Sequence, residues 1–155
     1  MTEKPVEIVI PKDKAVFWLD KNGCWHNKDG KFEHKKIIDF FHTSIRKDKS
    51  GYYLFQKREN YREKVYFRYE DTALFVFDVK KDREISFVLN TVRLLVLAPY
   101  DLFVKNDSLY VNIGDEQAKF TERSLMKVSD ILEFTNGEYF IRVKDKLFKI
   151  DDLTT

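Results

Sequence analysis

The fold class is decided by residues 64–97, KVYFRYEDTALFVFDVKKDREISFVLNTVRLLVL. Short apolar and aromatic runs alternate there with charged turn signals at 70–72 and 80–82. This spacing is typical of successive antiparallel strands, because β-branched and aromatic side chains pack well on a pleated surface. The pattern predicts a β-meander with strands near 64–69, 73–79, 84–89 and 92–97.

Two apolar stripes with helical spacing flank the predicted meander. The first predicts a helix over 33–46, and the second predicts a helix over 121–134. Thr121 or Ser124 is the candidate N-cap of the second helix. Asn-Gly and Asp-Gly pairs, which favour tight hairpin turns, occur at 22–23, 29–30 and 136–137.

These elements predict one α+β domain over 1–155, mostly antiparallel sheet with two helices. No Pro/Gly/Ser-rich linker interrupts the chain, and its 155 residues suffice for one core. The order strand, turn, helix, glycine turn, strand occurs over 23–69 and again over 108–150. Two repeated β-α-β units around a β-meander are one interpretation, and chance similarity between aromatic hairpins is the other.

Charge is nearly balanced over the whole chain but not along it. The 28 Lys and Arg residues against 26 Asp and Glu leave a net charge of +2, whereas residues 31–68 hold 11 basic against 5 acidic side chains. A single cysteine, Cys24, excludes an intrachain disulfide. The sequence has no apolar signal segment and no run long enough to span a bilayer. We therefore expect a cytoplasmic protein with no membrane partner.

Residues 23–79 carry a series of short motifs. They are Gly23-Cys24-Trp25, DKSGYYL at 48–54, Glu63-Lys64-Val65 and YEDTALF at 69–75. In this order and approximate spacing they resemble the bacterial DUF1285 family, a domain of unknown function. The family's Thr-Pro pair before Glu-Lys-Val is absent here, and the proline of its acidic segment is replaced. Weaker similarity extends the resemblance to about residues 20–150.

The resemblance implies a fold of repeated motifs in two halves and a role in signalling or ligand binding. It implies no catalytic residues, and we expect no cofactor. Glu70 and Asp71 carry the best match to the family signature, so they are the first polar site candidates. The predicted ligand-binding set consists of Trp25, Tyr52, Arg62, Glu70 and Asp71.

Familiar catalytic and metal-binding patterns are missing from the sequence. It has no Gly-rich phosphate loop, serine nucleophile elbow or Cys/His zinc cluster. His26, His34 and His42 are spaced eight apart, which favours solvated or capping histidines over a metal site. Cys24 is expected to be a small apolar strand residue rather than a nucleophile. Adjacent carboxylates at 70–71 point to opposite faces of a strand and suit a turn better than acid/base catalysis.

The alternative function is nucleic-acid binding through the basic aromatic segment 57–69. Cations that neutralise phosphates, interleaved with rings that stack on bases, are the components of a single-strand binding surface. Glu59 and Glu63 lie among them, so a solvated hairpin with cross-strand charge pairs is the competing interpretation. The residues concerned are Lys57, Arg58, Arg62, Arg68, Tyr61 and Tyr66.

We therefore expect a non-enzymatic binding module, with a role in signalling, that recognises a small ligand or a partner protein. The site is expected on the sheet and in the groove beside the two helical units. An enzymatic alternative would centre on Glu70 and Asp71, without an implied substrate. Unpaired edge strands offer a route to a homodimer.

Overall fold

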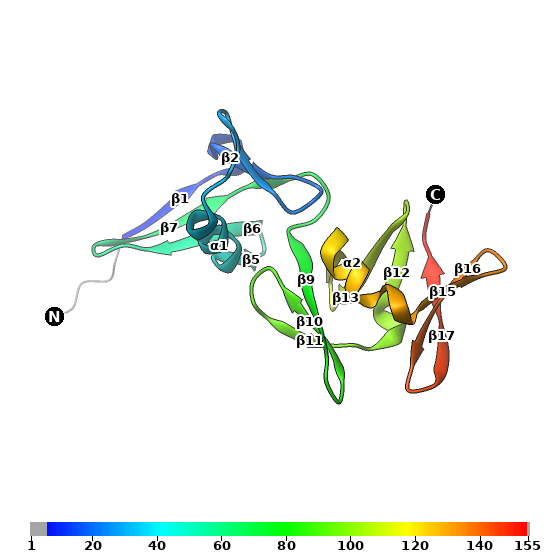
Figure 1. Ribbon diagram of the computed structural model, residues 1–155. Coiled ribbons are helices and arrows are strands. Elements are labelled where there is room, and N and C mark those ends of the chain that lie inside the picture. The colour runs from blue at the N-terminus through cyan, green and yellow to red at the C-terminus, as the bar shows by residue number, and fades with distance from the viewer. Residues whose placement is uncertain (1–5, 155) are drawn as a thin grey trace. The chain divides into compact units, whose positions relative to one another are not determined.

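The computed structural model describes residues 6–154 and divides the chain into two compact units. Unit 1 is Met1–Ala73 and unit 2 is Leu74–Thr155. Figure 1 colours unit 1 from blue to green and unit 2 from green to red. Within residues 6–154 the chain forms two α-helices and 17 β-strands. The expectation of a single domain over 1–155 stays a prediction.

The first sheet of unit 1 has the strand order β1-β7-β6-β5. Strand β6 pairs antiparallel with both β5 and β7, and β1 runs parallel to β7. The β5–β6 turn ends at Gly51, whose backbone φ of +119° is one that residues with a Cβ atom rarely adopt. The bounds are β1 (Val6–Ile10), β5 (Ile45–Asp48), β6 (Gly51–Lys57) and β7 (Tyr61–Tyr66).

The second sheet of unit 1 has the order β4-β3-β2-β8. Antiparallel hairpins join β2 to β3 and β3 to β4, whereas β8 runs parallel to β2. Only Phe67 separates β7 from β8, so one segment of chain supplies a strand to each sheet. The bounds are β2 (Phe17–Leu19), β3 (Trp25–Asn27), β4 (Gly30–Lys31) and β8 (Arg68–Tyr69).

The core of unit 1 is a cluster of aromatic side chains under helix α1 (Lys35–Thr43). The Trp25 ring is 1% exposed and meets the rings of Phe41 and Phe67 edge to face, at centroid distances of 5.2 and 5.0 Å. Trp25 Nε1 donates a hydrogen bond to His42 Nδ1 over 3.3 Å. Edge-to-face aromatic pairs add to the free energy gained from burying their large area, so this cluster fixes α1 on the sheet.

Unit 2 is built on one nine-stranded sheet with the order β11-β10-β9-β14-β13-β12-β17-β16-β15. Neighbours pair antiparallel except at β9–β14 and β12–β17, which are parallel. The bounds are β9 (Leu74–Lys81), β10 (Ile85–Leu89), β11 (Leu94–Val96), β12 (Leu102–Lys105), β13 (Ser108–Ile113), β14 (Glu116–Phe120), β15 (Leu132–Thr135), β16 (Glu138–Val143) and β17 (Lys146–Asp152).

Helix α2 (Glu122–Val128) follows β14 and packs against β9. Thr121 caps it, because its Oγ1 accepts a hydrogen bond from the Ser124 backbone N–H over 3.2 Å. A single 3-10 turn, Ser129–Ile131, then leads into β15. The core of unit 2 includes Phe87 and Phe120, whose rings meet edge to face at 5.0 Å.

Both units contain the same order of elements. Three hairpin-linked strands precede a helix and three hairpin-linked strands follow it, as β2-β3-β4-α1-β5-β6-β7 and as β12-β13-β14-α2-β15-β16-β17. In each unit the first strand of the series also has a parallel partner, which is the last strand of the series in unit 2 and the strand that follows the series in unit 1. These parallel partners are β2 with β8 and β12 with β17.

The predicted fold class, α+β with mostly antiparallel sheet and two helices, is confirmed. Three of the four meander strands are also confirmed as β9, β10 and β11. The first predicted strand, 64–69, instead forms β7 and β8, which pair with β6, β1 and β2 of unit 1. No helix among the described residues has the length and apolarity needed to cross a membrane.

Both predicted helices were too long at their C-terminal ends. The chain leaves α1 at Ser44, whose backbone N–H and Oγ both donate to the Phe40 carbonyl, and Ile45 starts β5 opposite Leu54. In the same way Leu132 pairs with Ile141, so the end of the second stripe becomes β15. The apolar residues at 45 and 132 lie in strands. Their spacing also fits a helix, so the spacing alone does not show that the helix has already ended.

Candidate functional site

Two of the predicted ligand-binding residues, Trp25 and Tyr52, lie in the interior of unit 1. Trp25 belongs to the aromatic core, as described above. Tyr52 is 9% exposed, and its ring meets the edge of the Tyr69 ring at 5.6 Å while Lys47 Nζ lies 5.5 Å above it. Both rings are therefore engaged in packing within unit 1.

The predicted polar residues Glu70 and Asp71 follow β8 at the edge of the second sheet. Glu70 Oε2 accepts a hydrogen bond from the Lys21 backbone N–H over 3.1 Å, which links this turn to the β2–β3 turn. Asp71 is half-buried. Arg62 is exposed on β7 in the other sheet of unit 1, so the predicted set is divided between two sheets.

Three of the six residues predicted for nucleic-acid binding share one face of the first sheet. We call the face opposite the buried Leu54 and Val65 the outer face; strand alternation and register place Lys57, Arg62 and Tyr66 on it. Tyr61 alternates onto the opposite face. Arg58 lies in the β6–β7 turn, where Nη2 donates to Gln56 Oε1 over 2.8 Å, and Arg68 belongs to the second sheet.

A hydrogen-bonded cluster lies on the outer face near the β5–β6 turn. Asp48 Oδ2 accepts from Tyr66 Oη over 2.6 Å and from Lys64 Nζ over 3.2 Å, and Lys64 Nζ lies 4.8 Å above the Tyr53 ring. The Tyr66 hydroxyl is the main cause of a lowered Asp48 pKa, and the same bonds to Asp48 raise the pKa of Tyr66 and of Lys64. Lys64 is thus neutralised by a neighbour, which leaves Arg46, Lys57 and Arg62 as outer-face cations without a carboxylate partner among the described residues.

The three histidines occupy unrelated positions in unit 1. His26 Nε2 lies 2.7 Å from Asp20 Oδ2, His34 is the exposed N-cap residue of α1, and His42 is buried beside Trp25. Between residues 6 and 154 no group of three or more His, Cys, Asp or Glu side chains is arranged to hold a metal ion.

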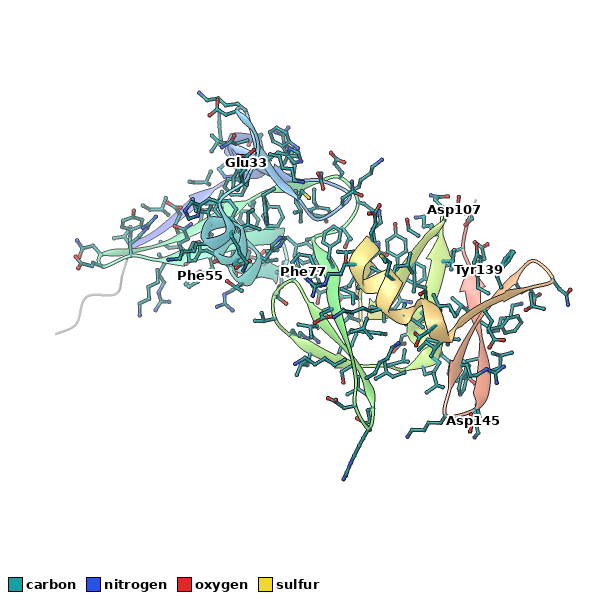
Figure 2. The ribbon with its side chains drawn as sticks, in the orientation of Figure 1. Glu33, Phe55, Phe77, Asp107, Tyr139 and Asp145 are labelled. Carbon is teal, nitrogen blue, oxygen red and sulfur yellow. The ribbon has the colours of Figure 1, made fainter. Side chains whose placement is uncertain are left out.

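Unit 2 contains a cavity of about 600 Å³ between the β9–β10 hairpin and the β16–β17 hairpin. Both hairpins project from the same end of unit 2; Figure 2 labels Asp145 at the β16–β17 turn and Asp107 at the opposite end. This volume lies within the range of cavities that hold small organic molecules. The apolar part of its wall consists of Ile85, Val96, Leu97, Pro99, Ile131, Val143 and Phe148.

The charged part of the wall is predominantly basic. It holds five cations and two carboxylates, Asp82 and Glu84, so its net charge is +3. Two cations are neutralised by carboxylates outside the wall: Lys81 Nζ lies 2.5 Å from Asp130 Oδ1, which lowers the pKa of Asp130, and Arg142 Nε lies 2.9 Å from Glu133 Oε2. Arg83, Lys144 and Lys146 have no such partner within the described chain.

Lys144 is held in an unusual backbone conformation at this cavity. Lys144 and Asp145 form the two-residue β16–β17 turn with φ values of +49° and +65°. The left-handed region costs an ordinary residue roughly 1–2 kcal/mol, and Asn or Gly normally occupies it. The β12–β13 and β15–β16 turns follow that preference with Asn106 and Asn136 at the first position. The lysine therefore occupies a position that turn chemistry alone would not assign to it.

Solved structures resemble this chain over most of its length. A DUF1285 family protein from Silicibacter pomeroyi DSS-3 matches with a TM-score of 0.60 and 16% identity, over 95% of this chain and 83% of that one. A second, from Shewanella baltica OS155, matches with a TM-score of 0.52 and 14% identity, over 74% of this chain and 91% of that one. The chain has the fold of the DUF1285 proteins.

The DUF1285 resemblance predicted from the motifs is thus confirmed at the level of the fold. No protein-family model matches the sequence, and no curated protein does. At this identity the likeness to DUF1285 structures carries no site residues, so the candidate site rests on the cavity and its own chemistry.

None of the unit 2 cavity residues was predicted from the sequence. Arg83, Lys144 and Lys146 lie at hairpin turns, and charged turn residues are ordinarily solvated. One signal was available: the link 144–146 between the last two predicted strands contains no Asn or Gly, the residues that a tight turn favours. The apolar wall gathers residues from 85 to 148 and follows only from the strand order of the DUF1285 fold.

A smaller cavity of about 290 Å³ lies beside α2 and the 3-10 turn in unit 2. Its lining includes Leu125 of α2 and Leu109, Leu132, Tyr139 and Ile150 of the sheet. The sequence predicted a site in the groove beside the two helical units. In unit 2 this cavity is the hollow that lies next to the helix. Its acidic residues, Asp107 and Glu133, are not accompanied by basic ones in the wall.

Proposed function

We propose that the protein is a non-enzymatic binding module that takes up a small organic acid with an apolar body in the larger cavity of unit 2. The observation that carries this proposal is the combination, in one wall, of seven apolar side chains and three cations that have no carboxylate partner among residues 6–154. The functional class, recognition of a small ligand, was expected from the sequence. The chemistry of the ligand is inferred from the residues of the cavity wall.

The two parts of the wall have separate energetic roles. An apolar ligand body that leaves water for the side chains around Phe148 gains about 25 cal/mol for each Å² buried. The acidic group of the ligand stays at the solvent-exposed rim, where each ion pair contributes at most about 1 kcal/mol. Arg83 adds geometric selectivity, because a guanidinium binds a carboxylate through two parallel hydrogen bonds.

Calorimetry with three ligands of equal chain length tests the proposal. Octanoate, octanol and octylamine share the apolar body and differ in the charge of the head group. We expect octanoate to bind most tightly, octanol more weakly, and octylamine most weakly because it is repelled by the cations. Absence of binding by all three, or equal binding of octanoate and octylamine, would contradict the proposal.

Lys144→Asn separates binding from folding. Asn accepts the left-handed backbone more readily, so we expect the free energy of unfolding to rise by up to about 1 kcal/mol. The same change removes a rim cation, so octanoate binding should weaken. Lys105→Asn, an exposed residue outside the wall, is the matched control and should leave octanoate binding unchanged. Stability measured in urea and affinity measured by calorimetry should therefore move in opposite directions.

Nucleic-acid binding on the outer face of unit 1 is the second candidate. It is favoured by Arg46, Lys57 and Arg62, which lie on the face that carries Tyr66 and have no carboxylate partner in the described part of the chain. Against it, Arg46 lies 5.3 Å above the Phe55 ring and Lys64 covers the Tyr53 ring, so two of the rings are shielded from bases.

Salt titration with a single-stranded oligonucleotide tests the second candidate. Affinity should fall steeply as salt rises, and each of Lys57→Gln and Arg62→Gln should reduce the slope by about one counterion. Arg93→Gln, at an exposed arginine of unit 2, is the control. An affinity that does not depend on salt would exclude this candidate.

The remaining expectations extend the proposal. A cytoplasmic location is consistent with Cys24 being a free thiol, because structural disulfides are rare in a reducing compartment. A binding module of this kind suits a signalling role in which the ligand reports on metabolism. The edge strands β11 and β15 of unit 2 are the surfaces on which the predicted homodimer would form, and size-exclusion chromatography with light scattering tests it.

A further inference from the structure

A row of four side chains crosses the second sheet of unit 1. The registers place Lys31 beside His26, His26 beside Trp18, and Trp18 beside Arg68, one residue from each strand. Alternation puts this row on the face opposite the buried Leu19 and Trp25. Two aromatic rings thus lie side by side on this face, with a cation at each end of the row.

The two rings at the centre of the row are fixed in place. The Trp18 and His26 rings stack with a centroid distance of 5.6 Å and an interplanar angle of 9°. His26 Nε2 is bonded to Asp20 Oδ2 over 2.7 Å, while Asp20 Oδ1 accepts from the backbone N–H groups of Asn22 and Cys24. Burial opposes ionisation of Asp20, but these hydrogen bonds outweigh it and hold its pKa below the usual value. The stack is therefore organised before any ligand arrives.

A cavity of about 440 Å³ opens beside Trp18. Its wall includes Val16, which is 77% exposed, and the cations Lys28 and Arg68. Neither cation has a carboxylate partner within the described chain. Asp29 is the single acid in the wall, so the net charge is +1, and its backbone N–H is bonded to Asn27 Oδ1. A half-buried indole, an exposed apolar residue and two cations thus share one opening.

We propose that this cavity binds a mononucleotide, whose base stacks on Trp18 and whose phosphate contacts Arg68 and Lys28. A planar ring extends the existing Trp18–His26 stack, and aromatic stacking tolerates any base. A guanidinium matches a phosphate through two parallel hydrogen bonds, and the ammonium of Lys28 adds a second positive charge. The site lies in unit 1 and is independent of the organic-acid cavity in unit 2.

Tryptophan fluorescence of the full chain, with AMP, adenosine and ribose 5-phosphate as probes, tests the proposal. The protein has two tryptophans, and Trp25 is enclosed in the core, so a ligand that stacks on Trp18 should quench the more exposed emission. We expect AMP to bind about tenfold more tightly than adenosine, because only AMP adds the phosphate contacts. Ribose 5-phosphate should bind weakly and without quenching.

Variants separate the base from the phosphate. Arg68→Gln should weaken AMP binding by part of this tenfold preference and leave adenosine binding unchanged, whereas Trp18→Leu should weaken both. Arg93→Gln, an exposed arginine of unit 2 outside both cavities, is the matched control. The emission of Trp25 in Trp18→Leu reports whether the core is intact, and Arg68→Gln remains informative if that variant does not fold.

Three results would overturn the proposal. They are the absence of AMP quenching at millimolar concentration, an Arg68→Gln variant that binds AMP like the unmodified protein, and adenosine binding as tight as AMP binding. An oligonucleotide that binds far more tightly than AMP, with affinity that rises with length, would also overturn it, since the surface would then recognise a nucleic-acid chain.

Discussion

His42 is a titratable side chain in the core of unit 1, with 1% of its surface exposed. Burial lowers its pKa from 6.5 to about 4, although Asp39 and a hydrogen bond with the Gly23 backbone oppose the shift. The ring therefore stays neutral in the folded protein over a pH range in which the unfolded chain already binds a proton. Its Nδ1 remains available as the acceptor of the Trp25 indole N–H.

This difference in proton binding predicts a loss of stability on acidification. Above pH 6.5 both states carry a neutral His42, so the group has no effect; as the pH falls from 6.5 to 4, only the unfolded state is protonated. The free energy of unfolding should therefore decrease by roughly 3 kcal/mol over this window. Urea unfolding at several pH values provides the measurement.

His42→Gln is the control for this prediction, because it keeps an acceptor for Trp25 but does not titrate. Its unfolding free energy should change less between pH 6.5 and 5 than that of the unmodified protein. The carboxyls with lowered pKa, such as Asp20 and Asp78, lose their stabilising effect only at lower pH, so they do not mask the result. Equal pH slopes in both proteins would contradict the assignment.

At the level of single residues, the sequence showed which aromatic residues stand out more readily than it showed which face of a strand their rings occupy. Trp25 was selected as a ligand contact, yet the alternation of a three-residue strand is too short to show which side of β3 faces the core. Trp18, seven positions earlier, lies on the opposite face of the same sheet, away from the aromatic core. Trp25 is buried because the ring of Phe41 in α1 packs against it, and the motif Gly23-Cys24-Trp25 carries no information on that contact.

At the level of elements, the two helices differ in how their N-termini are satisfied. Thr121, one of the two N-cap candidates from the sequence, caps α2 through the Ser124 backbone N–H, whereas His34 precedes α1 without a side-chain capping bond. α1 also begins with Lys35 and Lys36 and has no acidic residue in its first turn. Positive side chains at that end oppose the helix dipole, so the start of α1 is weakly stabilised.

Substitutions at the two caps should have opposite effects. His34→Asp supplies a capping oxygen and a negative charge at a residue that already has extended dihedrals, and it should raise the free energy of unfolding by about 1 kcal/mol. Thr121→Ala should lower it by about 1–2 kcal/mol, while Thr121→Ser, which keeps the hydroxyl, should change it little. Urea denaturation measures all three. A destabilised His34→Asp variant would show that His34 has another role.

Turn chemistry explains why hairpins were predicted better than helix ends. Asn136 and Gly137 have φ values of +53° and +78°, the conformation that this pair of residues favours, and β16 begins where the turn predicts. β14 escaped prediction because Glu116–Phe120 alternates a few apolar residues with polar ones and follows a short Gly114-Asp115 turn. The parallel partner of β14, β9, lies about forty residues earlier, and local sequence carries no information on that pairing.

At the level of the whole molecule, each unit has a core of its own. Trp25 and Phe67 anchor the core of unit 1, and Phe75 and Phe87 anchor that of unit 2, all with 0 or 1% exposure. Chains of about 75 residues can each bury enough surface to fold, although with modest stability. Composition and the absence of a flexible linker predicted one domain, but these features do not determine whether two cores unfold together.

We expect the two units to unfold independently, and Phe67→Ala tests this expectation. Phe67 is fully buried and its ring lies 5.0 Å from that of Trp25, so its truncation should cost unit 1 about 3–5 kcal/mol. Because a small domain is stable by only about 5–15 kcal/mol, hydrogen exchange should accelerate strongly in β2, β3 and β6. Protection of β9, β13 and β14 should stay as in the unmodified protein. The reciprocal variant, Ile141→Ala, should affect only unit 2, whereas equal loss of protection in both units would support the single cooperative domain predicted from the sequence.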